Sequence, residues 1–181
     1  MPIPSRLAAS IRPLTASLLL ACALAAAACR SAPPPPPLPA GVDWKPFEQG
    51  LAEAKASRRP ICLIFYTDWC PHCRNYQKVF EDKAVIELSR RFVMIHENKE
   101  KVPEISARFA PDGDYIPRTL FLTPDGTLMP EVTEQRDEYR YFYDESDPAS
   151  VMRSMKEVAV DRKSTRLNSS HTAESRMPSS A

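Results

Sequence analysis

Residues 61–73 read ICLIFYTDWCPHC. The first six are apolar or aromatic, which is typical of a buried strand, and Pro71 suits the first position of a helix. Cys70 and Cys73 therefore fall where a strand ends and a helix begins, three positions apart. The stretch predicts an α/β fold with a cysteine pair that can form a disulfide at the end of a central strand.

The predicted surroundings of Cys70 favour its thiolate, the form that attacks disulfides. The residue lies beside the unpaired backbone N–H groups and the positive end of the predicted helix. A donating or protonated His72 ring, between the two cysteines in sequence, adds to that stabilisation. Cys73, one turn further along, is placed to resolve a mixed disulfide formed at Cys70. Cys70, Cys73 and His72 are thus candidate catalytic residues.

Two other uses of a C-x-x-C pair fit less well. A structural zinc site needs four ligands, and the further candidates are only Cys62 and His96, with no second C-x-x-C motif in the chain. A purely structural disulfide between such near neighbours restricts the unfolded chain little. We therefore expect no metal site and favour the redox interpretation.

The N-terminus has the order of charges and apolar residues that is typical of a secretory signal. Arg6 and Arg12 precede an apolar run over residues 14–28, which is short for a membrane-spanning helix. We expect a signal peptide over residues 1–28 and an exported domain.

The end of this apolar run resembles the lipobox of bacterial lipoproteins. Residues 26–29 read AAAC, which makes Cys29 the candidate lipidation site. Cys22 is the alternative: it has the Leu three residues earlier that lipoboxes prefer, but cleavage there would leave an apolar stub. Simple secretion is the third possibility. The resemblance implies a protein anchored by lipid at the periplasmic face of a bacterial membrane, or alternatively a secreted or soluble periplasmic one.

A proline-rich segment separates the lipobox from the domain. Residues 29–40 contain five consecutive prolines and a sixth at Pro39, so they form neither helix nor sheet ladder. We expect an extended polyproline tether that holds the domain away from the membrane.

The last segment resembles translated DNA of another origin. Residues 161–171 and 175–181 are encoded codon for codon by strings that look like a common short-read sequencing adapter. We expect residues 161–181 to be non-native read-through, and they carry no part of the fold or function.

Residues 41–160 are enough for a single domain with alternating elements. The patterns predict helices over residues 47–57, 71–80, 82–90 and 103–109, and a last helix that begins at Asp147-Pro148; they predict strands over residues 61–66, 92–96, 118–123, 127–132 and 139–143. This order predicts an α/β sandwich. Basic residues are interspersed with acidic ones, so we expect no nucleic-acid partner.

The W-C-x-x-C motif after a strand, together with Ile116-Pro117 just before a later strand, resembles the thioredoxin family. Residues 109–122 and 141–143 are similar to the single-domain thioredoxin-like proteins of the endoplasmic reticulum, including the anterior-gradient group. The Pro71-His72 dipeptide looks like that of the disulfide oxidase DsbA. The resemblance implies a thioredoxin fold, with a central mixed β-sheet flanked by helices.

The resemblance also implies roles for site residues. Pro117 would be a cis-proline facing the two cysteines, and the backbone of Ile116 would pair with an extended substrate segment. Trp69 and Pro71 would border the same substrate-binding surface. Cys62, on the strand, is expected to be a small buried core residue.

One departure from the thioredoxin pattern concerns proton transfer. Thioredoxins carry a buried acid six residues before the first active cysteine, and this chain has Ile64 there. Proton transfer at Cys73 would then rely on water, His72 or Glu97.

These observations predict an extracytoplasmic thiol–disulfide oxidoreductase that needs no cofactor. Its expected partners are cysteine-containing protein substrates, a membrane or periplasmic redox partner, and the membrane itself through the lipid anchor. The direction of the reaction is open, and His72 favours an oxidising role. The alternative is a binding module without turnover, which takes copper through the cysteine pair with His72 or His96, or a client protein through the surface around Trp69 and Pro117.

Overall fold

A four-stranded mixed sheet forms the centre of the domain in the computed structural model, which describes residues 37–160. Its strands are β1 (Trp44–Lys45), β2 (Ile61–Tyr66), β3 (Val93–Asn98) and β4 (Arg118–Leu122), in the spatial order β1-β3-β2-β4. The first three strands are parallel, and β4 pairs antiparallel with β2. This is a thioredoxin fold, as the resemblance implied.

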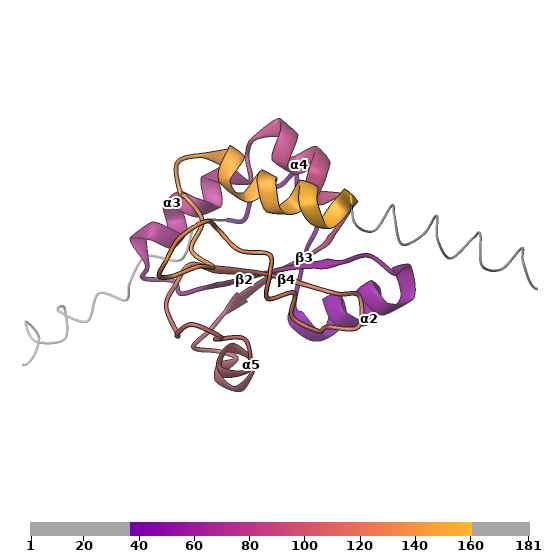
Figure 1. The fold of residues 1–181 in the computed structure, drawn as a ribbon, viewed down its shortest axis with the longest axis horizontal. Helices are drawn as coiled ribbons and strands as arrows, with labels where there is room; N and C mark the ends of the chain where they lie inside the picture. Colours follow the sequence, from indigo (N-terminus) through magenta and orange to yellow (C-terminus); the bar gives the residue numbers. More distant parts are fainter. Residues whose placement is uncertain (1–36, 161–181) are drawn as a thin grey trace, which may run out of the picture. The chain divides into compact units, whose positions relative to one another are not determined.

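Helices cover both faces of the sheet. They are α2 (Phe47–Ser57), α3 (Pro71–Val79), α4 (Lys83–Ser89), α5 (Pro103–Arg108) and a final helix over residues 148–160. Figure 1 shows α3, α4 and the final helix on one side of the sheet, and α2 and α5 on the other. The side chain of Asp82 accepts hydrogen bonds from the N–H groups of Ala84 and Val85, which confirms the predicted start of α4.

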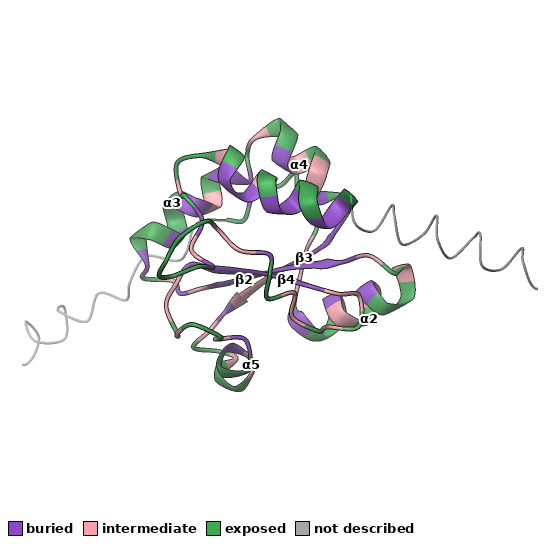
Figure 2. Cartoon of the chain, in the orientation of Figure 1, coloured by how far each residue is buried: buried purple, intermediate pink, exposed green. Residues whose placement is uncertain are grey.

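Side-chain alternation along the strands divides the interior into two cores (Figure 2). In β2, Cys62 and Ile64 face the core beneath α3 and the final helix, whereas Leu63 and Phe65 face the core beneath α2. The same alternation in β3 puts Met94 under α3. Every residue of β2 except Tyr66 is buried, which explains why the strand reads as an unbroken apolar run.

Two predicted strands are wrong. Only an isolated bridge between Leu122 and Leu128 forms where a strand over 127–132 was expected, and residues 139–143 contain no strand. Pro130 lacks the N–H that a ladder requires, and Tyr139 has a positive φ of 52° that ends extended backbone. Tyr141 nevertheless lies along β4, since its carbonyl accepts a 2.8 Å hydrogen bond from the N–H of Thr119.

Several predictions concern residues outside the described range. They are the signal peptide over 1–28, both lipidation candidates, most of the tether and the adapter-like segment 161–181. Within residues 37–160, no helix is long and apolar enough to span a membrane.

Candidate active site

The cysteine pair lies at the junction of β2 and α3, as the sequence predicted. Cys70 is the N-cap of α3, with extended backbone, and Pro71 occupies the first turn. A disulfide joins Cys70 to Cys73, with their Cα atoms 5.3 Å apart. The Sγ atom of Cys70 also accepts a hydrogen bond of 3.1 Å from the N–H of Cys73. The helix N-terminus thus directs a backbone donor at Cys70, which stabilises negative charge on that sulfur when the bridge opens.

The oxidised pair is covered rather than open. Cys70 is 3% and Cys73 is 7% exposed, whereas Trp69 beside them is 61% exposed. The indole N–H of Trp69 donates a 2.9 Å hydrogen bond to Glu100. Pro71 and His72 are exposed as well. Trp69, Pro71 and His72 therefore form the exposed surface next to the covered sulfurs.

The loop that ends at Pro117 completes the site. The Ile116–Pro117 peptide bond is cis, as the resemblance implied. Pro117 is buried and lines a small cavity together with Cys73, while Ile116 is half-buried. The backbone N–H and carbonyl of Ile116 make no hydrogen bond within residues 37–160, so they are available to an extended segment of a partner.

His72 lies on the outer surface of α3. Its Nδ1 is 2.8 Å from a carboxylate oxygen of Glu145, and its ring meets Phe142 edge-on at 6.1 Å between centroids. Because a carboxylate can only accept, Nδ1 carries the proton of this hydrogen bond. Asn75 donates to the other oxygen of Glu145 at 3.2 Å. We expected a protonated or donating His72 to stabilise the thiolate of Cys70. Its hydrogen-bonding partner in the structure is Glu145, and an effect on Cys70 stays a prediction.

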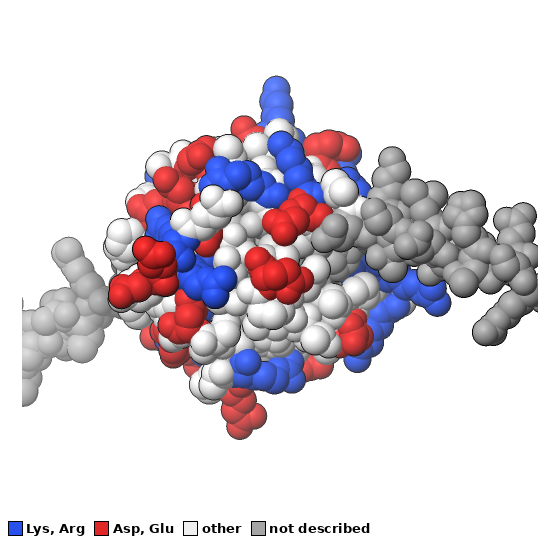
Figure 3. Space-filling view, in the orientation of Figure 1, with Lys and Arg blue, Asp and Glu red and all other residues white. Residues whose placement is uncertain are grey.

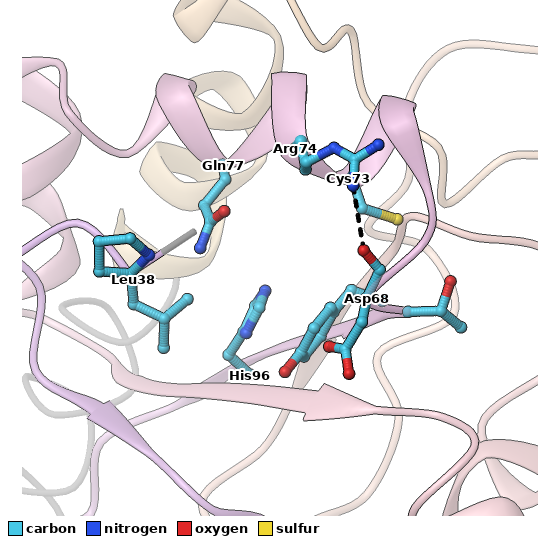
Figure 4. Close-up of a pocket in the computed structure, with 9 residues that line it drawn as sticks. Leu38, Asp68, Cys73, Arg74, Gln77 and His96 are labelled. Carbon is cyan, nitrogen blue, oxygen red and sulfur yellow. Dashed lines mark hydrogen bonds between the residues drawn. The ribbon is translucent and has the colours of Figure 1, made fainter. Parts of the chain in front are cut away.

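His96 lies on the opposite, inner side of α3. Its ring stacks on Tyr66 at 4.0 Å between centroids and contacts Trp44 at 5.3 Å. Its Nδ1 is buried without a hydrogen-bond partner, and burial lowers the pKa of His96 to about 3. The ring borders a pocket of about 270 Å³ that Cys73 and Gln77 also line (Figure 4).

The other residues named from the sequence are placed as follows. Cys62 is fully buried in the core, as predicted, and burial raises the pKa of its thiol. Ile64 is buried in the same core. Glu97, named as a route for the proton of Cys73, instead accepts a hydrogen bond from the backbone N–H of Phe47 at the start of α2. Since Phe47 belongs to the core on the far side of the sheet, Glu97 is directed away from Cys73.

Arg118 is a residue of the site that the sequence analysis missed. It follows Pro117 directly and is fully buried. Its guanidinium donates to the carbonyls of Ser106, Gly113 and Tyr115 at 2.9–3.2 Å and to the hydroxyl of Ser106 and the carboxylate of Asp114. It therefore fixes the loop before the cis-proline to α5 and β4. An Arg at a strand start gave no sign of this, because its acceptors are mostly backbone carbonyls.

Metal ligands are not grouped in the described part of the chain. Residues 37–160 contain no cluster of three or more His, Cys, Asp or Glu side chains arranged to hold a metal ion. His72 and His96 lie on different sides of α3, so they do not converge on the cysteine pair from one direction.

The fold is that of thioredoxin, and the arrangement of the cysteine pair and the cis-proline is similar to that of thioredoxin-like proteins. A family model described as thioredoxin-like matches residues 43–124, which include the cysteine pair and the cis-proline. A thioredoxin from Thermus thermophilus has a similar fold, with a TM-score of 0.53 at 22% identity, over 66% of this chain and 88% of that one.

Curated proteins similar to the chain include several anterior gradient proteins. The chain is 31% identical to anterior gradient protein 2 homolog of Homo sapiens over 113 residues, which are 62% of this chain and 63% of the relative. The Mus musculus homolog is 33% identical over the same lengths. Anterior gradient protein 3 of Xenopus tropicalis is 29% identical over 120 residues, 63% of this chain and 70% of the relative. The chain thus spans about 63% of the length of the first two relatives.

Proposed function

We propose that the chain is an extracytoplasmic thiol–disulfide oxidoreductase that acts on cysteines of proteins through Cys70 and Cys73. The observation that carries this proposal is the bridged pair at the N-terminus of α3, next to the cis peptide bond before Pro117. A disulfide with so few enclosed residues contributes little to stability, which leaves exchange as its use. The thioredoxin-like family match and the fold support the same class of chemistry.

The exchange proceeds in two displacements. In the reducing direction, the thiolate of Cys70 attacks a partner disulfide, one partner sulfur leaves as a thiolate, and a mixed disulfide forms at Cys70. Cys73 then loses its proton and attacks Cys70, which releases the second partner sulfur and closes the Cys70–Cys73 bridge. Two electrons pass to the partner. The oxidising direction reverses both steps, so the same residues serve either direction.

Each neighbouring residue has a role in this proposal. The free backbone groups of Ile116 align an extended partner segment beside the sulfurs. Trp69 and Pro71 supply exposed surface for contact with the partner. His72 tunes the thiolate of Cys70 from the outer surface. We propose no cofactor, because thiols and disulfides carry the electrons themselves.

The proposed location rests on the N-terminal sequence. The signal-like residues 1–28, lipidation at Cys29 or Cys22 and the proline-rich tether would hold the domain at the periplasmic face of a membrane, near a membrane or periplasmic redox partner. Charges support a protein rather than a nucleic-acid partner, since Lys and Arg are interspersed with Asp and Glu on the face shown in Figure 3.

Expression in a bacterium with radiolabelled palmitate tests the lipid anchor. Label that is lost in Cys29→Ser supports lipidation at Cys29. Label retained there and lost in Cys22→Ser moves it to Cys22, and no label at all contradicts it.

The activity is tested by thiol exchange with a protein disulfide. We expect the purified protein to catalyse reduction of insulin by dithiothreitol, and Cys70→Ser to lose this catalysis. Cys62→Ser is the matched control, because Cys62 is fully buried away from the exchange site. Equal activity of the wild type and Cys70→Ser, each no greater than dithiothreitol alone, would contradict the proposal.

A further inference from the structure

His96 lies next to the position at which the thioredoxin pattern has a buried acid. That pattern places a buried acid at the position of Ile64, whose neighbour in the sheet register is His96 on β3. Alternation along β3 directs His96 to the same side as Met94, beneath α3. A titratable side chain therefore lies one strand away from the position of the missing acid.

His96 and Cys73 share their surroundings. Both line the pocket of about 270 Å³ shown in Figure 4, and both line a second, smaller cavity that reaches Ile64 and Pro117. In Figure 4 the ring of His96 points from the sheet toward α3, and Cys73 lies on that helix with its sulfur directed to the side of the ring rather than at it. The larger pocket has room for several water molecules, since a single water needs roughly 10–15 Å³. Water there can connect the imidazole with the sulfur.

Three residues that line the same pocket carry unpartnered polar atoms. The Nδ1 of His96, the Oγ1 of Thr67 and an oxygen of Asp68 are buried and make no hydrogen bond within the described residues. Thr67 is only 1% exposed. Buried polar atoms in folded proteins are almost always paired with protein or ordered water. Several unpaired atoms around one cavity indicate a site for hydrogen-bonded water next to Cys73.

Before the exchange His96 is neutral, so one ring nitrogen can accept a proton, although burial opposes its protonation. The titratable groups around it are Tyr66 and Asp68 at the end of β2, and Cys73, Arg74 and Tyr76 on α3. The guanidinium of Arg74 is held by the carbonyl of Asp68 at 3.1 Å. With the bridge closed, burial keeps the imidazole neutral at physiological pH. A thiolate at Cys73 adds a negative charge across the pocket, which favours the imidazolium.

We propose that His96 accepts the proton of Cys73, through water in this pocket, when Cys73 resolves the mixed disulfide. The inference rests on the proposed function and adds the proton acceptor to it. The Cys73 S–H bond breaks and its proton passes to the Nδ1 of His96. The resulting thiolate attacks Cys70, the bond from Cys70 to the partner sulfur breaks, and the partner leaves as a thiolate. The proton then returns from His96 through the pocket to the departing thiolate or to solvent.

Stopped-flow exchange with 5,5′-dithiobis(2-nitrobenzoate) separates the two displacements. The reduced full chain, with Cys22→Ser and Cys29→Ser to remove other thiols, releases one yellow thiolate when Cys70 attacks and a second when Cys73 resolves. His96→Asn and His96→Asp form a matched pair, because the two side chains have the same shape and only Asp can take up a proton. At pH 7 we expect His96→Asn to lower the rate of the second phase about ten- to hundredfold. The first phase should change less than about threefold, since Cys70 does not use this acceptor.

The pH profile separates proton transfer from packing. In His96→Asn, the second phase should keep rising with pH at least one unit beyond the point where the wild type levels off, while His96→Asp recovers much of the wild-type rate at pH 7. The inference would be overturned if the rate of the second phase were the same in all three proteins, or if both variants lowered that rate equally. Failure of the wild type to release a second thiolate would instead overturn the proposed function.

If the His96 variants fail to fold, the native His96 side chain can still be measured directly. In Cys70→Ala, Cys73 is a free thiol, and NMR can follow the ring of His96 and the β-carbon of Cys73 against pH. We expect one shared titration step in both signals. Independent titration of the two groups would overturn the inference.

Discussion

The two histidines beside α3 differ in almost every property that matters for thiol chemistry. His72 is exposed, and its Nδ1 is committed to Glu145. His96 lies beneath the helix, stacked on Tyr66, with an unpartnered Nδ1 that borders the same cavities as Cys73. The Nδ1 of His72, inside the motif, therefore already has a hydrogen-bonding partner at the surface. The Nδ1 of His96, far away in sequence, has none, and His96 lines the same cavities as Cys73. This difference teaches that the two sides of α3 offer different environments, and in the proposed exchange the outer side would act on Cys70 and the inner side on Cys73.

The largest effects should come from the cysteines themselves, which the two sides of α3 are proposed to serve. Cys70→Ser should abolish exchange, a loss of more than about a hundredfold, because no attacking thiolate remains. Cys73→Ser should stop turnover but retain the attack, so that a mixed disulfide with the partner accumulates at Cys70 and is seen by mass spectrometry. Normal turnover of Cys73→Ser would contradict a resolving role and would leave His96 without a function.

Arg118 holds the loop before Pro117, which lines a cavity on the inner side of α3. Arg118→Met should lower the free energy of unfolding by about 3–5 kcal/mol, because the buried carbonyl of Ser106 and the half-buried carbonyls of Gly113 and Tyr115 lose their donor. Urea unfolding measures this loss. Arg153→Met is the control, since Arg153 pairs with Glu134 at 2.7 Å at the surface and should contribute less than about 1 kcal/mol. Similar losses in both variants would show that the network of Arg118 does not hold the loop.

Burial of a neutral His96 makes stability depend on pH. Its folded pKa of about 3 lies below the ordinary value of 6.5, so the unfolded chain binds a proton that the folded chain does not between these values. Stability should therefore fall as pH falls through this window, by up to about 1.4 kcal/mol per pH unit from this residue. Urea unfolding between pH 4 and 7.5 should show a smaller slope in His96→Asn than in the wild type. An unchanged slope would mean that His96 is not held neutral in the fold.

The smallest effects should come from His72 and Glu145 on the outer surface of α3. Removing the carboxylate in Glu145→Gln takes a negative charge away from the neighbourhood of Cys70, so the pKa of the Cys70 thiol should fall, and His72→Gln should raise it. We expect shifts below about one pKa unit, because the pair is exposed and screened by salt. Thiolate absorbance at 240 nm against pH measures both shifts. Shifts of several units would make His72, rather than the helix N-terminus, the main activator of Cys70.

Local sequence patterns were sufficient for most of the fold. The unbroken apolar run of β2, the N-caps at Cys70 and Asp82 and the position of Pro71 are signals within a few residues, and each element formed where they predicted. The two wrong strands show the limit of such signals. Segments 127–132 and 139–143 make isolated backbone contacts with β4, at Leu128 and Tyr141, but no continuous ladder, because Pro130 and the backbone of Tyr139 interrupt it.

The candidate site was predicted only in part, for a physical reason. Cys70, Cys73 and Pro117 belong to short motifs, so the sequence identified them. His96 and Arg118 have neighbours that the sheet brings together, and those contacts depend on strand register, which no short motif encodes. Glu97 was named as a proton route and His96 only as a metal ligand, although the alternation of β3 directs these neighbours to opposite faces.

The most direct test of the central claim is the equilibrium of the Cys70–Cys73 pair with glutathione. In protein with Cys22→Ser and Cys29→Ser, the exposed Trp69 next to the pair offers a fluorescence signal, and mass spectrometry counts the thiols. We expect one reversible transition between dithiol and disulfide across mixtures of reduced and oxidised glutathione, with Cys62 unmodified throughout. A pair that stays bridged, or never bridges, across all mixtures in both directions would contradict the account.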